Sequence, residues 1–124
     1  MTDLKLGLVE TRFADIVWQH APLTIKELLA LCEQELNWKR TTTYTVIKRL
    51  SERGILKNEN TVVTALVSKE EVQASEIDNL VKNKFEDSLP AFVAAFAKHR
   101  NLSHADNDAV RAMIDQYRKE HSDE

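Results

Sequence analysis

Apolar residues recur at helical spacing near the start of the chain and predict a first helix there. The stretch from about residue 7 to 19 repeats apolar residues three and four positions apart, and it ends before Pro22, which interrupts a helix. Its predicted apolar face consists of Val9, Phe13, Ile16 and Val17.

A second helix is predicted from Ile25 to about Leu36, after a short extended piece at Leu23 and Thr24. Thr24 and Glu27 form a capping box, in which each side chain accepts the other residue's backbone N–H. The apolar stripe of this helix is Ile25, Leu28, Leu29, Cys32 and Leu36.

The stretch between Trp38 and Gly54 predicts a third, basic helix. Thr41 to Thr43 are candidate N-caps, and Gly54 stands where a left-handed residue ends a helix. One face is apolar and predicted to be buried: Thr43, Val46, Ile47 and Leu50. The opposite face is polar: Thr41, Thr42, Tyr44, Thr45, Lys48, Arg49 and Glu52.

The pattern changes after Gly54, where Ile55–Leu56 and residues 61–66 are β-branched and apolar. Residues 58–60 between them are typical of a turn, so a small hairpin is predicted. Three helices followed by a hairpin make a winged helix-turn-helix, in which the third helix is presented to DNA. The boundaries predicted from the sequence are 1–67 for this DNA-binding domain and 68–124 for a helical dimerisation region.

From Ser68 onward the pattern is purely helical, with predicted helices over residues 69–86, 89–99 and 104–118. Ser68 with Glu71, Ser88, and Ser103 with Asp106 are the predicted caps. Three short amphipathic helices rarely bury a sufficient core by themselves, so we expect them to pair with a second copy. The predicted dimer contacts are Leu80, Val81, Phe85, Leu89, Phe92, Val93, Phe96, Val110 and Ile114. The predicted fold is thus mainly α-helical with a small β-hairpin.

Composition narrows the classes of function. The 124 residues have a net charge of −3, yet residues 39–57 contain six basic residues and only one acid, Glu52. No segment is long and apolar enough for a membrane span, no signal peptide is evident, and Cys32 is the single cysteine, so a cytoplasmic protein is expected. Four scattered histidines and no Gly-rich loop predict neither a metal site nor a cofactor, and an enzyme is not expected.

A basic helix face lined with hydroxyls suits the DNA major groove, where hydroxyls meet base edges or phosphates and Lys and Arg neutralise the backbone. The predicted DNA-binding residues are Lys39, Arg40, Thr41, Thr42, Tyr44, Thr45, Lys48, Arg49, Arg53 and Lys57. An ion pair that positions the helix is an alternative role for Arg49. The alternative function is a winged-helix protein-interaction module that does not bind DNA.

The chain resembles the penicillinase-repressor family of bacterial transcriptional regulators, which includes β-lactamase, methicillin-resistance and copper-transport repressors. The matching landmarks are Trp18, the APLT at 21–24, Thr42, Thr45, Arg49–Leu50, Gly54, LVSKEE at 66–71 and SLPAFVAAF at 88–96. The resemblance implies an N-terminal winged helix, a C-terminal dimerisation region, and repression by a homodimer on a palindromic double-stranded operator.

The chain departs from the family at positions that matter for its regulation. Tyr44 stands where relatives carry Lys or Arg, and the wing is short. Antibiotic-response members are cut at an Asn-Phe bond that is matched here by Ala95–Phe96, and the C-terminal cysteine pairs of the copper-sensing members are missing. A sensor protein or a small ligand is left open as a further partner that releases the protein from DNA.

Overall fold

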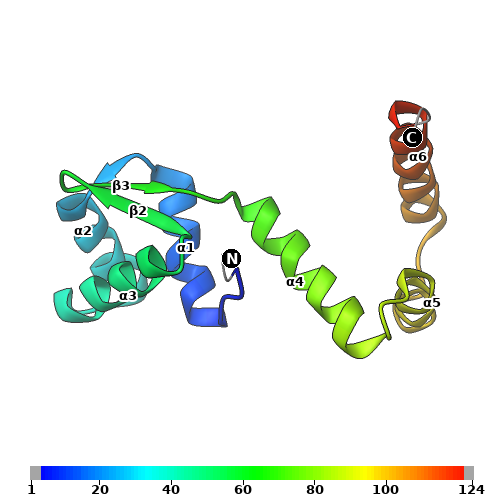
Figure 1. Ribbon diagram of the computed structural model, residues 1–124, viewed down its shortest axis with the longest axis horizontal. Helices are drawn as coiled ribbons and strands as arrows, with labels where there is room; N and C mark the ends of the chain where they lie inside the picture. Colours follow the sequence, from blue (N-terminus) through cyan, green and yellow to red (C-terminus); the bar gives the residue numbers. More distant parts are fainter. Residues whose placement is uncertain (1–3, 122–124) are drawn as a thin grey trace. The chain divides into compact units, whose positions relative to one another are not determined.

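A computed structural model of the chain describes residues 4–121, in which six helices and three short strands follow one another (Figure 1). The predicted fold class is confirmed, and the extended piece before the second helix adds a third strand to the hairpin. In chain order the elements are α1 (Leu8–His20), β1 (Leu23–Thr24), α2 (Ile25–Leu36), α3 (Arg40–Glu52), β2 (Leu56–Glu59), β3 (Val62–Ala65), α4 (Lys69–Lys84), α5 (Leu89–Arg100) and α6 (His104–Glu120).

The three strands form one antiparallel sheet in the order β1-β3-β2. Asn60 and Thr61 connect β2 to β3 with positive φ angles of 54° and 63°, as a two-residue type I′ hairpin turn requires. The turn predicted at residues 58–60 is therefore wrong in position. Asn58 and Glu59 belong to β2 instead, since they pair with Val63 and Val62 of β3.

The first three helices and the sheet enclose one apolar core. Phe13, Leu28, Leu50 and Val63, from α1, α2, α3 and β3, all have 0% of their surface exposed. Trp38, in the link between α2 and α3, stacks on Phe13 with the ring centroids 5.6 Å apart. The link that sets the start of α3 is therefore held against α1.

One residue of the predicted core is exposed. Val9, in the first turn of α1, keeps 57% of its surface exposed, although it precedes the buried Phe13 by one helical turn. Leu6, from the segment before the helix, is buried in the core instead. Periodicity identifies which side of a helix is buried, but it does not show where along the helix the core ends.

The start of α3 also differs from the prediction. The helix begins at Arg40 with Lys39 as its N-cap residue, which makes no side-chain cap bond. Thr43 and Thr45 lie inside the helix, and their hydroxyls donate to the carbonyls of Lys39 at 3.4 Å and Thr41 at 2.9 Å. The threonines therefore hydrogen-bond one turn back along the helix rather than cap it.

The predicted end of α3 is confirmed. Gly54 has a φ of 77°, and its N–H donates to the Ser51 carbonyl at 3.1 Å. The next N–H, from Ile55, donates to the Leu50 carbonyl at 3.0 Å, which completes a Schellman motif. This turn directs the chain from α3 into β2, and Ile55 is buried.

The start of α4 is bound to the first three helices. The Trp18 indole N–H donates to the Val67 carbonyl at 3.0 Å, and Lys69 Nζ lies 2.9 Å from Asp15 Oδ1. Val72, in the first turn of α4, is buried in the same core as Phe13 and Leu50. The predicted capping box at Ser68 and Glu71 is present.

The chain divides into two compact units within α4, after Leu80. The prediction from sequence places the domain boundary after residue 67, where the hairpin ends. The contacts just described explain why the first turns of α4 stay with the winged helix. Below, the described residues up to Leu80 are called the winged-helix unit, and those from Val81 onward the C-terminal unit.

The C-terminal unit contains the end of α4 with α5 and α6. The hydroxyls of Ser88 and Ser103 cap α5 and α6 as predicted, and each accepts a backbone N–H at 3.1 Å. Phe92 contacts Phe85 edge to face and stacks on Phe96, with centroids 5.6 and 6.2 Å apart. Nevertheless, α5 and α6 contain no buried residue within the described part of the chain.

Candidate nucleic-acid interface

The two faces of α3 are separated as the sequence predicts. Thr43, Val46, Ile47 and Leu50 are buried, and all the residues predicted for the polar face are exposed. Helical spacing places Thr41, Thr45, Lys48 and Glu52 at the part of the helix farthest from the core. The acid is in the last turn, so the first three turns present hydroxyls and cations without a carboxylate.

A hollow of about 590 Å³ lies on the α2 side of this face. Arg40 and Tyr44 line it from α3, and Lys26 and Glu33 line it from α2. Thr61, in the turn of the wing, also reaches it, because its carbonyl accepts the Ile25 N–H at 2.9 Å. The start of α2 and the turn of the wing therefore meet beside the first turns of α3.

A second hollow, of about 380 Å³, lies on the α1 side of the same face. Thr41, Thr42, Thr45 and Arg49 line it from α3, and the exposed Val9 lines it from α1. The polar face of α3 is therefore a ridge with a hollow on each side. A ridge of this kind matches a helix that enters a major groove about 12 Å wide while neighbouring elements approach the two phosphate backbones.

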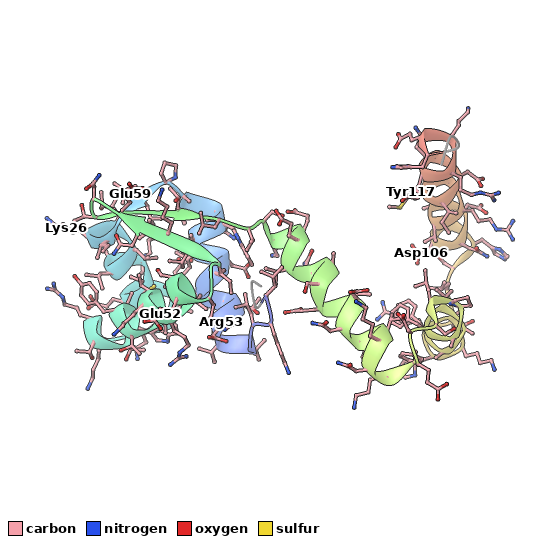
Figure 2. All side chains as sticks on the ribbon, in the orientation of Figure 1. Lys26, Glu52, Arg53, Glu59, Asp106 and Tyr117 are labelled. Atoms are coloured by element: carbon pink, nitrogen blue, oxygen red, sulfur yellow. The ribbon has the colours of Figure 1, made fainter. Side chains whose placement is uncertain are left out.

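The two arginines at the end of α3 share one carboxylate. Glu10 Oε2, on α1, lies 3.4 Å from Arg53 Nη1 and 3.6 Å from Arg49 Nη1. Arg53, which lies beside α1 (Figure 2), also donates to the Lys5 carbonyl, and its side chain is only 20% exposed. Arg53 was predicted for DNA, but the structure places it against α1, whereas Arg49 is 54% exposed at the edge of the second hollow.

The wing carries one of the predicted cations, Lys57, which forms an ion pair with Glu59 on the same strand. Both side chains are more than half exposed. The pair makes β2 locally neutral, so the wing contributes little net attraction for a polyanion. The remaining predicted cations, Lys39, Arg40 and Lys48, are exposed on α3 or at its N-cap.

Two residues of this surface were missed by the sequence reading, Lys26 and Thr61. Both line the hollow beside Arg40 and Tyr44, and Lys26 projects outward at the start of α2 (Figure 2). Their sequence positions gave no sign of this, since Lys26 lies in the first turn of α2 and Thr61 in a hairpin turn. The register of the β1–β3 pair brings them to the same side of the unit.

The model of the penicillinase repressor family matches residues 6–116 of the chain. The chain belongs to this family. Its members are DNA-binding transcriptional repressors rather than enzymes, which agrees with the winged helix and with the exposed polar face of α3. A comparison with curated proteins gave no match.

The C-terminal unit of this repressor exposes many apolar side chains. Leu89, Val93 and Phe96 of α5 and Val110 and Ile114 of α6 are each roughly half exposed or more. Of the other residues predicted for dimerisation, Leu80 is exposed, Phe85 and Phe92 are half-buried, and Val81 is already buried within the chain. The predicted set therefore includes exposed apolar side chains on both helices.

Cys32 of the repressor lies in the core beneath α3. Burial raises the pKa of its thiol from 9.0 to about 11, although a hydrogen bond with Thr43 by itself lowers this pKa. Both residues are fully buried. A thiol in this position packs as a small apolar side chain and is poorly reactive.

Residues 4–121 contain neither a metal-binding cluster nor a membrane-spanning helix. No group of three or more His, Cys, Asp or Glu side chains is arranged there to hold a metal ion. The helices described in this range are each too short or too polar to cross a membrane.

Proposed function

We propose that this repressor acts as a homodimer on a palindromic operator in the cytoplasm, with α3 of each copy in the major groove. The observation that carries the proposal is the ridge of α3, where exposed hydroxyls and cations stand between two hollows. The exposed hydroxyls can reach base edges, while the cations of the same face reach the phosphates.

The residues have different proposed roles. Thr42, Tyr44 and Thr45 approach base edges, because they lie in the first turns of α3, the part of a recognition helix that contacts bases. Lys39, Arg40 and Lys48 contact phosphates, and Lys26 joins them from the start of α2. Arg53 is proposed to hold the end of α3 against α1, because Glu10 and the Lys5 carbonyl bind it.

The C-terminal unit supports dimerisation. Its helices α5 and α6 bury no residue within one chain, and apolar side chains on helices of this length are normally covered. A second copy supplies the same surface in return, as a two-fold symmetric interface requires. Two linked copies then address two half-sites about one helical turn apart.

For release from DNA, we propose a ligand or a sensor partner that acts on the C-terminal helices. The asparagine at which antibiotic-response relatives are cut is replaced by Ala95, within α5. The repressor should therefore stay at full length during derepression in its own host, which an immunoblot would follow. A fragment ending near Ala95 would refute this mode of release.

Selection of bound sequences from a random duplex pool tests the function. We expect a palindromic consensus, with affinity that falls steeply as salt rises. Tyr44→Ala should cost about 1–3 kcal/mol on the best site and change the preferred bases. Lys48→Ala should weaken all duplexes alike and reduce the salt slope by about one. Failure to enrich any sequence would favour a protein-interaction module instead.

A further inference from the structure

Glu10 makes more contacts than its position at the start of α1 requires. Its Oε1 accepts the Gly7 N–H at 3.1 Å, which completes the cap of its own helix. Its other oxygen, Oε2, faces Arg49 and Arg53 in the last turn of α3 and just after it. One carboxylate, 19% exposed, therefore joins the start of α1 to the end of the proposed recognition helix.

The two arginines differ in what else they can reach. Arg53 is 20% exposed and also binds the Lys5 carbonyl. Turning it toward DNA would break its interactions with both the Glu10 carboxylate and this carbonyl. Arg49 is 54% exposed and lines the hollow next to Thr41 and Thr45. Arg49 thus lies between the carboxylate and the surface that is proposed to meet DNA.

We infer that Glu10 is a positioning residue for DNA recognition, which rests on the function proposed above. Paired permanently with Arg53, it anchors the end of α3 on α1. From the same oxygen it orients the Arg49 guanidinium, whose other N–H groups then contact a phosphate at the edge of the threonine face. A guanidinium has five N–H donors in a planar fork, so it can bind a carboxylate and a phosphate together.

The direction of the effect separates this role from simple electrostatics. A carboxylate near the DNA surface repels phosphates, so removing its charge would by itself tighten binding to any duplex. If Glu10 instead positions Arg49 and α3, removing the charge weakens binding to the preferred site more than to other DNA. The two accounts predict opposite signs for the same substitution.

The test compares full-length Glu10→Gln with the wild type on the selected operator and on unrelated duplex, over a range of salt concentrations. We expect the operator dissociation constant to rise about tenfold, the size of one lost charge-assisted contact. The salt slope should fall by about one, because the Arg49 phosphate contact is lost. Equal or tighter operator binding by Glu10→Gln would overturn the inference.

A double-mutant cycle shows whether Glu10 acts through Arg49. Arg49→Gln should weaken operator binding by a similar factor, and the double variant should be little weaker than either single one. Independent effects that multiply to about a hundredfold would contradict the proposed path. Asp15→Asn is the matched control, since it removes a paired carboxylate from the same helix where it binds Lys69. We expect it to leave operator affinity within about twofold of the wild type.

Glu10→Asp keeps the charge and the cap acid while it draws the carboxylate away from both arginines. Glu10→Asp replaces Glu10→Gln in the test if Glu10→Gln does not fold. Operator binding by Glu10→Asp that is close to the wild type would also overturn the inference. Circular dichroism of each variant at the binding temperature confirms that folded protein is compared. If the wild type binds no duplex at all, the proposed function is wrong. If the wild type binds and the Glu10 variants bind the operator equally well, only this inference is wrong.

Discussion

The winged-helix unit and the C-terminal unit differ in how far they bury their apolar side chains within a single chain. In the first, every helix contributes to one core, and Phe13, Leu28 and Leu50 are fully buried within a single chain. In the second, α5 and α6 bury nothing, although they carry Leu89, Val93 and other large apolar residues. In both units the helices form from local sequence signals such as N-caps, so helix formation alone does not explain the difference.

The difference lies in how the elements are connected and what they can cover. The sheet and three helices of the first unit close around Leu50 and Val63 from several directions. In the second unit, the aromatic contacts of Phe92 join α5 to the end of α4, yet the apolar residues of α6 find no such cover. The first unit is therefore expected to fold by itself, and the second to need a partner surface.

The largest expected effect contrasts two leucines. Leu50→Ala removes a fully buried side chain and should lower the free energy of unfolding of the winged-helix unit by about 2–5 kcal/mol. Leu89→Ala, at a position 59% exposed in the single chain, should change the stability of a monomer by less than about 0.5 kcal/mol. Urea unfolding at low protein concentration measures both.

The effects of Leu50→Ala and Leu89→Ala should also depend differently on protein concentration. If Leu89 is covered by a second copy, its substitution should become destabilising as the protein concentration rises, whereas the effect of Leu50→Ala should stay constant. A Leu89→Ala effect that is large at every concentration would show that the C-terminal unit has a core of its own.

A smaller effect is expected when the apolar face of α6 is interrupted. The double substitution Val110→Asp with Ile114→Asp places two charges on surface that a dimer would bury, and it should give a protein of single-chain mass, 14.2 kDa. Operator affinity should fall by about a hundredfold, because the two half-sites are then bound independently. Light scattering and a mobility-shift assay measure the two outcomes.

Lys119→Asp is the control for this charge change on the same helix, since helical spacing places Lys119 on the face opposite Val110 and Ile114. It should leave the dimer intact. Dimers that survive the substitutions at Val110 and Ile114 would remove α6 from the interface, and the search would move to the apolar residues of α5.

The smallest expected effect tests how closed the first core is. The pKa of Cys32 is raised by burial from 9.0 to about 11, so the folded state holds the thiol proton more tightly than the unfolded state does. The stabilisation is complete below about pH 9 and is lost as pH rises through about 11.

Because lysines and tyrosines titrate in the same range, the quantity to measure is the stability of the wild type relative to Cys32→Ala at each pH. This difference should decline between pH 9 and 11. A flat difference would mean that the thiol is reached by water in the folded protein, and that the core below α3 is looser than the structure shows.

Local patterns in the sequence were enough for the elements and for one face of the site. The capping boxes at Thr24 and Ser68, and Gly54 after α3, depend on neighbours within a few residues, and all were predicted correctly. The division of α3 into buried and exposed faces follows from helical period alone, so the threonines and Tyr44 of the candidate interface were also predictable.

Contacts between distant residues were decided by the tertiary structure. Arg53 reads as one more cation of a basic helix until Glu10, forty-three positions earlier, is brought to 3.4 Å from it. Trp18 and Val67 are forty-nine positions apart, and their hydrogen bond helps to keep the start of α4 with the winged helix. Lys26 lines the same hollow as Arg40 and Tyr44 because α2 is packed beside α3. Period and capping act over one or two helical turns, whereas the partner of a charge depends on which surfaces the folded core brings together.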